Sequence, residues 1–380
     1  MKRVETQFLE IATRRKPLEL LSGESIGPVR LAYETYGRLN AARSNAVLVF
    51  HALSGSQHAA GYNPSVPGAE DLWIEECHTG WWDGFIGPEG ALDTNRFFVI
   101  CANYLGGCYG STGPRSPHPE TGKPYGGSFP RITLSDIVES QLGLLDHLGI
   151  ERLHAAIGAS LGGILSVLLA TRYPERVRNV IPIGAGLTVT PLQRIHNLEQ
   201  IMAIEADPRF KGGHYDPDKP PARGLALARM IAHKTYVSLS AMEERARDEV
   251  VRRREPLRWY RLNSPLESYM LHQGLKFVKR FDANTYLRII DAWQRFDLVR
   301  EAVGTDLVSI FRRCREQRYL IFTIDSDVCF YPEEQAEMAR VLKAAGVEAT
   351  WVTVHSEKGH DSFLIEPHLY RPFLQAMLTP

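Results

Sequence analysis

The stretch Gly158-Ala159-Ser160-Leu161-Gly162-Gly163 decides how this sequence is interpreted. It lies between a largely apolar run, 153–157, and a run with helical spacing, 164–173. This pattern predicts a buried strand, a sharp turn with Ser160 at its apex, and a helix. The serine hydroxyl would then project above a sheet, beside the first amides of the helix. A glycine-rich connection that carries an ordinary serine would give the same pattern.

The composition narrows the class of protein. The 380 residues suffice for one elaborated domain or for a domain with an insert. Basic and acidic residues both number 44, so nucleic-acid binding through bulk positive charge is not expected. Five cysteines without a Cys-x-x-Cys motif indicate reduced thiols and no zinc site. The sequence shows neither a signal peptide nor a run of membrane-spanning length. We therefore expect a cytoplasmic protein with no metal and no membrane partner.

Strand-like and helix-like segments alternate over most of the chain. Strand-like segments are 29–36, which suggests antiparallel pairing, and 46–50, 97–102, 155–157, 180–183, 319–324 and 349–354. Helical spacing marks 134–148, 335–345 and 369–377. Alternation of this kind predicts an α/β fold with a mainly parallel sheet flanked by helices on both faces.

The alternation stops after Gly186. From about 187 to 303 the chain reads as helices, most clearly at 225–240 and 284–296. We therefore expect a core formed by 1–186 and 304–380, with a helical lid inserted at 187–303. A charge run at 243–255 mixes both signs, which fits a solvated helix face.

A serine hydroxyl needs a base and an orienting acid to act as a nucleophile at neutral pH. In chains of the α/β-hydrolase type the order is serine, acid, histidine. Among thirteen histidines, His360 is best placed, because it follows a glycine in a loop after the last strand-like run. A plain surface-loop role is its alternative. Asp325 and Asp327 both follow the run 319–324, and the pattern alone leaves both open as the acid.

An oxyanion hole needs a second amide from a loop after an early strand. The segment 50–55 follows the strand-like run 46–50, so the backbone N–H groups of Leu53 and Leu161 are the expected donors. His51 is a second candidate for the base, and anchoring this loop is its alternative role. The phosphate-cradle motif G-x-x-x-x-G-K-[ST] and the zinc motif H-E-x-x-H are both absent from the sequence.

Further distinctive stretches lie along the whole chain. They are Tyr33-Glu34-Thr35-Tyr36-Gly37 with Asn40, His51-Ala52-Leu53-Ser54-Gly55, Gly80-Trp81-Trp82-Asp83, Asn103-Tyr104-Leu105-Gly106-Gly107-Cys108-Tyr109-Gly110-Ser111-Thr112-Gly113-Pro114, Gly122-Lys123-Pro124-Tyr125-Gly126, Arg229-Met230-Ile231, Glu267-Ser268-Tyr269, Arg280-Phe281-Asp282-Ala283-Asn284-Thr285-Tyr286 and Gly359-His360-Asp361. In these stretches the chain resembles the homoserine O-acyltransferase family of methionine biosynthesis. The resemblance implies the α/β-hydrolase fold with an inserted helical lid, and a homodimer formed through that lid.

The resemblance also implies residue roles. It places the nucleophile on Ser160 and the base on His360. The family element Ser-Asp-x-x-Phe/Tyr-x-Pro matches 326–332, which places the acid on Asp327, although Tyr331 is an additional residue before the proline.

The residues that would bind the acceptor follow from the same resemblance. The family's substrate-binding arginine and tyrosine fall on Arg229 and Tyr236, and its acidic residue after the catalytic histidine falls on Asp361. Arginine can hold a carboxylate through its planar fork, and Asp361 can pair with an ammonium. A structural ion pair within the lid is the alternative for Arg229.

The reaction implied is transfer of an acetyl group from acetyl-CoA to the side-chain hydroxyl of L-homoserine through an acyl-serine. Acetyl-CoA is then a co-substrate, and no cofactor is bound permanently. Succinyl-CoA as the donor, L-serine as the acceptor, and simple ester hydrolysis by the same fold remain alternatives, because each needs only a change of pocket.

Overall fold

The computed structural model describes residues 2–247, 257 and 259–379. Within this part of the chain, eight strands form one sheet in the order β1-β4-β8-β5-β9-β10-β11-β12. In that order they are β1 (Gln7–Ala12), β4 (Val29–Tyr36), β8 (Phe98–Ala102), β5 (Ala46–Phe50), β9 (Leu153–Ala159), β10 (Val177–Ile183), β11 (Arg318–Ile324) and β12 (Glu348–Val354). The pairs β1–β4 and β4–β8 are antiparallel, and all later pairs are parallel. The mainly parallel sheet is therefore confirmed.

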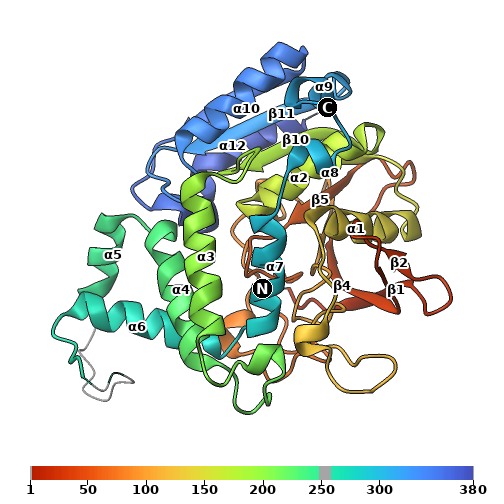
Figure 1. Cartoon of the computed structure of the whole chain (residues 1–380). Coiled ribbons are helices and arrows are strands. Elements are labelled where there is room, and N and C mark those ends of the chain that lie inside the picture. Colours follow the sequence, from red (N-terminus) through yellow and green to blue (C-terminus); the bar gives the residue numbers. More distant parts are fainter. Residues whose placement is uncertain (1, 248–256, 258, 380) are drawn as a thin grey trace.

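Helices cover the sheet on both faces, as the alternation predicted (Figure 1). The helices outside 187–303 are α1 (Leu134–His147), α2 (Leu161–Arg172), α9 (Leu307–Arg312), α10 (Pro332–Ala345), α11 (Ser362–Ile365) and α12 (Pro367–Leu378). Strand β5 shows how both faces of the sheet are buried. Leu48 and Phe50 pack in one apolar cluster with residues of α1, α2 and α10, whereas Val47 and Val49 pack in a second cluster with residues of α12. A strand buried on both faces reads as a continuous apolar run.

The segment 187–303 is helical, and among the described residues no strand lies between β10 and β11. Its helices are α3 (Pro191–Glu205), α4 (Ala222–Tyr236), α5 (Leu239–Ala246), α6 (Pro265–Val278), α7 (Ala283–Gln294) and α8 (Leu298–Glu301). Helices α5 and α6 lie at the outer edge of the molecule (Figure 1). In contrast, Tyr286 and Ile289 of α7 belong to the same apolar cluster as Leu48 of the sheet. The division of the chain into two domains at 186/187 and 303/304 therefore stays a prediction.

One expected helix is wrong. The segment 225–240 is not continuous, because α4 ends at Tyr236, Val237 is extended, and a new helix begins after Ser238. Ser238 caps α5 by accepting a hydrogen bond from the Ala241 amide at 3.3 Å. The break lies against the loop that carries His360, since a Cβ atom at Gly359 would be 2.6 Å from the Ser238 nitrogen. Of the charge run 243–255, residues 248–255 lie outside the described part.

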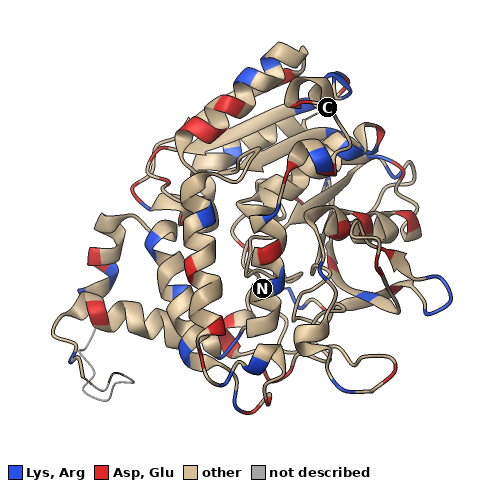
Figure 2. Cartoon of the chain, viewed as in Figure 1, with Lys and Arg blue, Asp and Glu red and all other residues tan. Residues whose placement is uncertain are grey.

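Acidic and basic residues are interspersed along the chain (Figure 2), in keeping with the zero net charge. In the described ranges, no helix is both long and apolar enough to cross a membrane. Two further strand pairs are short: β2 (Leu18–Glu19) with β3 (Ser25–Ile26), and β6 (Ile86–Gly87) with β7 (Leu92–Asp93).

Candidate active site

Ser160 lies at the turn between β9 and α2, with φ 59° and ψ −129°. A positive φ is uncommon for a residue that carries a side chain. The chain passes so closely here that a Cβ atom at Gly158 would lie 2.0 Å from the Gly162 carbonyl oxygen. A Cβ atom at Gly162 would lie 2.2 Å from the Phe50 carbonyl oxygen. The two glycines therefore fit where larger residues would collide, and the predicted strand, turn and helix are confirmed.

His360 and Asp327 form a buried pair close to this turn. His360 Nδ1 lies 2.6 Å from Asp327 Oδ2, and the amides of Cys329 and Phe330 donate to Asp327 Oδ1 at 2.7 and 2.9 Å. This assigns the ring proton to Nδ1. The other ring nitrogen, Nε2, is buried and has no hydrogen-bond partner among the described residues. It is therefore free to accept a proton from a hydroxyl group in the cavity that Ser160 and His360 both line.

Two opposing effects set the pKa of His360. Burial lowers the pKa, but the charge of Asp327, the hydrogen bond to it and the charges of Asp361 and Glu334 together outweigh burial. The net result is a pKa above the ordinary value of 6.5. Such a pKa suits a base that must hold a proton during reaction and release it afterwards.

Asp325, the rival acid, lies elsewhere. Its Oδ2 is 2.8 Å from His355 Nδ1, and its Oδ1 accepts the Ser356 amide at 3.0 Å. The Asp325 side chain is 41% exposed, whereas that of Asp327 is fully buried. The structure thus brings Asp327, and not Asp325, to His360.

The two expected oxyanion donors lie on neighbouring segments. The N–H group of Leu161 is the first amide of α2, and such an amide has no acceptor within its own helix. Leu53 lies in a turn closed by a 3.0 Å hydrogen bond from the Gly55 amide to the Ala52 carbonyl. The close approach of Gly162 to the end of β5 brings this turn against the start of α2. Leu53 therefore lines the cavity together with Ser160, and Leu161 directly follows Ser160 in the chain.

His51 anchors that turn. Its ring stacks on Tyr104 with centres 3.6 Å apart, and its Nδ1 lies 2.8 Å from the Ala52 carbonyl oxygen. Burial lowers the pKa of His51 to about 4, so the ring is neutral at pH 7. These contacts fit the anchoring role better than the role of a second base.

Arg229, Tyr236 and Asp361 line the same cavity as Ser160. The Arg229 guanidinium carbon lies 5.1 Å from the Tyr236 ring centre and 4.9 Å from that of Phe277. Among the residues that the structure describes, no carboxylate lies within 4.0 Å of Arg229. Asp361 has one long contact, 3.9 Å, with Arg245. Burial raises the pKa of Asp361, although the charge of Arg229 opposes this effect.

Gly184, which the sequence did not single out as a site residue, borders the His360–Asp327 pair, and Glu334 acts on the pair through its charge. Gly184 follows β10 with φ 50°, and a Cβ atom there would lie 3.1 Å from Asp327 Oδ2. Burial raises the pKa of Glu334 to about 8, and its carboxyl group accepts a hydrogen bond from Gln193 of α3 at 3.2 Å. Gln193 also donates to the carbonyl oxygen of Cys329 at 2.9 Å, so a hydrogen bond joins α3 directly to the loop that carries Asp327. The only signal in the sequence for these residues was that Gly184 directly follows a strand-like run.

Comparison with known proteins agrees with this geometry. A family model described as the alpha/beta hydrolase fold matches residues 45–367. A homoserine O-acetyltransferase of Rhodospirillum rubrum is 43% identical over 365 residues, which cover 95% of this chain and 90% of that protein. A homoserine O-succinyltransferase of Acidithiobacillus ferrooxidans is 40% identical, with 97% and 94% covered.

Solved structures give the same fold. The homoserine O-acetyltransferase from Bacillus anthracis has a TM-score of 0.87 at 27% identity, with 100% of this chain and 99% of that chain covered. Esterase E22 has the same TM-score and identity, with 99% and 100% covered. Because relatives above 40% identity match almost the whole length, this chain belongs to the homoserine O-acyltransferase family, within the α/β-hydrolase fold.

Proposed function

We propose that this protein transfers the acetyl group of acetyl-CoA to the side-chain hydroxyl of L-homoserine, as a step of methionine biosynthesis. One observation carries the proposal. Ser160, His360 with the buried Asp327 behind it, and the opposite charges of Arg229 and Asp361 meet at one cavity of about 320 Å³, which all of them except Asp327 line. That volume falls in the range of small-molecule sites.

In the first half-reaction, Ser160 is the nucleophile. His360 Nε2 removes the hydroxyl proton as Ser160 Oγ attacks the thioester carbonyl. The amides of Leu53 and Leu161 stabilise the negative charge that develops on the carbonyl oxygen. Asp327 orients the ring and stabilises the imidazolium. The thiol of coenzyme A then leaves with the proton from His360, and an acetyl ester remains on Ser160.

In the second half-reaction, homoserine attacks that ester. Arg229 holds its carboxylate, and Asp361 holds its ammonium. Asp361 lacks a close cation and is partly desolvated, so an ammonium ligand would stabilise its ionised form. His360 removes the proton of the acceptor hydroxyl and passes it to Ser160 Oγ, which leaves as the acetyl ester of homoserine forms. The helices of 187–303 act as a lid that limits access of water to the ester.

Assays that cross acetyl-CoA and succinyl-CoA with L-homoserine and L-serine test this proposal. We expect the highest kcat/KM for acetyl-CoA with L-homoserine. A higher kcat/KM with succinyl-CoA would change the donor and agree with the function named for the Acidithiobacillus relative. Ester hydrolysis without transfer to either amino acid would instead make this chain resemble esterase E22 in activity as well as in fold.

Arg229→Ala is expected to weaken homoserine binding by about 2–5 kcal/mol, because it removes one partner of a desolvated charge pair. Acylation by acetyl-CoA should change little, so acetyl-enzyme should accumulate and hydrolyse slowly to acetate. Arg229→Lys should recover only part of the loss, since an ammonium lacks the fork. Single-turnover kinetics of the two half-reactions measure this split.

The exposed residue Arg223 on the same helix provides the matched control, and Arg223→Ala should behave like the parent protein. If Arg229→Ala used homoserine as well as the Arg223→Ala control does, Arg229 would be a structural residue of the lid.

We also propose a homodimer formed through the lid. Ile195, Leu198 and Met202 lie on one face of α3 at helical spacing and are 54%, 50% and 59% exposed. A contiguous exposed apolar face of this kind is typical of an interface. Ile195→Glu with Met202→Glu should therefore give a monomer by sedimentation velocity, whereas Leu21→Glu, at an exposed leucine far from α3 in the sequence, should not. A parent protein that sediments as a monomer would contradict the proposal.

A cytoplasmic location is the last part of the proposal. All five cysteines are free, and free thiols are typical of a reducing compartment. Cell fractionation that places the protein outside the cytoplasm would contradict it.

A further inference from the structure

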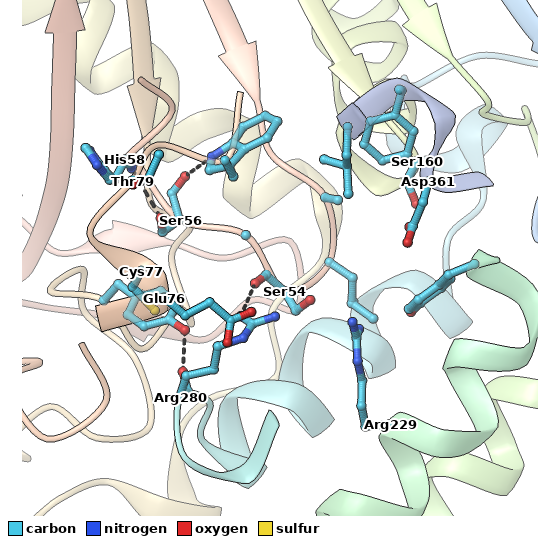
Figure 3. Close-up of a pocket in the computed structure, with 18 of the residues that line it drawn as sticks. Ser54, Ser56, His58, Glu76, Cys77, Thr79, Ser160, Arg229, Arg280 and Asp361 are labelled. Carbon is cyan, nitrogen blue, oxygen red and sulfur yellow. Dashed lines mark hydrogen bonds between the residues drawn. The ribbon is translucent and has the colours of Figure 1, made fainter. Parts of the chain in front are cut away.

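The cavity continues beyond Ser160 to a second arginine. Arg280 lies between α6 and α7, and together with Glu76 and Cys77 it borders the cavity on the side opposite to Ser160 and Asp361 (Figure 3). The mechanism above uses only the end near Ser160. The end near Arg280 therefore has no assigned role.

The guanidinium of Arg280 is held in place but has few polar partners. Nη1 donates to the Ser54 carbonyl oxygen at 3.3 Å, and the guanidinium carbon lies 5.0 Å from the ring centre of Phe277. The hydroxyl of Tyr109 donates to the Arg280 carbonyl oxygen and so fixes its backbone. In the described ranges, no carboxylate lies within 4.0 Å of the guanidinium. Most of its five N–H donors are therefore available to a ligand.

The neighbours of Arg280 indicate what kind of ligand fits. Glu76 lines the same wall, and its carboxylate pairs with Lys276 at 3.1 Å. A second carboxylate beside Glu76 would be repelled. Trp73, Trp81 and Tyr109 give the cavity apolar surface, and Ser54, Ser56 and Thr79 add polar groups without charge. A neutral chain that carries both methylene groups and carbonyl oxygens matches these surroundings.

The acyl donor of the proposed reaction contains such a chain. Its pantetheine arm is neutral and holds two amide groups, and it must run away from Ser160 once the thioester reaches the nucleophile. We propose that Arg280 binds an amide carbonyl oxygen of this pantetheine arm, and so selects donors that carry it. The inference rests on the proposed function, since it requires a coenzyme A thioester as the donor.

Binding of free coenzyme A, measured by isothermal titration calorimetry, tests this inference without any turnover. Arg280→Met should bind coenzyme A about 10- to 100-fold more weakly than the parent protein, the loss typical of one hydrogen bond to a charged group. Pantetheine, which lacks the nucleotide, should lose affinity by a similar factor. Arg223→Met, at an exposed position of α4, is the matched control and should bind both like the parent.

Hydrolysis of p-nitrophenyl acetate separates ligand binding from a structural role. This donor acylates Ser160 but has no pantetheine arm, so Arg280→Met should leave its kcat/KM within about twofold of the parent value. Arg280→Lys, which retains a charge, should recover part of the coenzyme A affinity. Thermal unfolding of each variant shows whether it is folded.

Several results would overturn the inference. Unchanged coenzyme A affinity in Arg280→Met would do so while the proposed function stands. Weaker binding of coenzyme A with unchanged binding of pantetheine would assign Arg280 to a phosphate. A parallel loss with p-nitrophenyl acetate would make Arg280 a support for the Ser54 turn only. If Arg280→Met lost affinity for succinyl-CoA but kept its affinity for coenzyme A, Arg280 would instead bind the carboxylate of the succinyl group. If the parent protein bound no coenzyme A, the proposed function would fail together with the inference.

Discussion

Replacing Ser160 with alanine is expected to lower kcat for acetyl transfer about 10⁴-fold or more. The loss is large because both half-reactions pass through an ester on this oxygen. Folding should be retained, since alanine carries the same Cβ atom as serine at φ 59° and removes only a hydroxyl group. Steady-state kinetics together with thermal unfolding measure the two effects.

The control is a second buried serine on the helix that follows. The hydroxyl of Ser166 donates to the Gly163 carbonyl within α2 at 2.8 Å, so Ser166→Ala should keep the activity of the parent. A Ser160→Ala variant that retained a tenth of the activity would remove Ser160 from the mechanism.

Asp327→Asn is expected to lower kcat about 10³- to 10⁴-fold, because an amide can neither hold His360 in the required tautomer nor stabilise its protonated form. Asp325→Asn should be much milder, since Asp325 pairs with the exposed His355 at the surface. The two substitutions change the same atoms two residues apart, so each controls for the other. The reverse ranking would move the acid to Asp325.

The pH profile gives an independent measure of the same pair. His360 acts as a base only when it is neutral, and its pKa lies above 6.5. The kcat/KM of the parent should therefore be low at acidic pH and increase with pH, with an inflection above pH 6.5. In Asp327→Asn the stabilising charge is lost while burial remains, so the inflection should move to lower pH. An inflection that stays in place would contradict the role of Asp327.

The core of the fold could be predicted because its signals are local. The apolar run 46–50 becomes β5 with the same bounds, since a strand buried on both faces needs no partner to be recognised. The turn at Ser160 could be predicted because close packing demands glycine at fixed positions around it. In contrast, the break after Tyr236 lies against Gly359, more than a hundred residues later in the sequence. Helical spacing over 225–240 carries no trace of that contact.

The candidate site shows the same limit. Asp325 and Asp327 both follow β11, and the pattern alone could not separate them, because the choice depends on which carboxylate the last loop of the chain meets. His355 meets one and His360 meets the other. Arg280 gave no signal of its own, since its significance lies in the missing carboxylate partner and in the cavity it borders. Such features exist only after distant segments have come together.

The central claim is that Ser160 carries the acetyl group between donor and acceptor. Rapid-quench intact-protein mass spectrometry with acetyl-CoA alone tests it most directly. We predict a burst of about one equivalent of free coenzyme A, together with the mass of one acetyl group on the peptide that contains Ser160. An unchanged protein mass, together with intersecting initial-velocity lines for the two substrates, would contradict this claim and indicate direct transfer in a ternary complex.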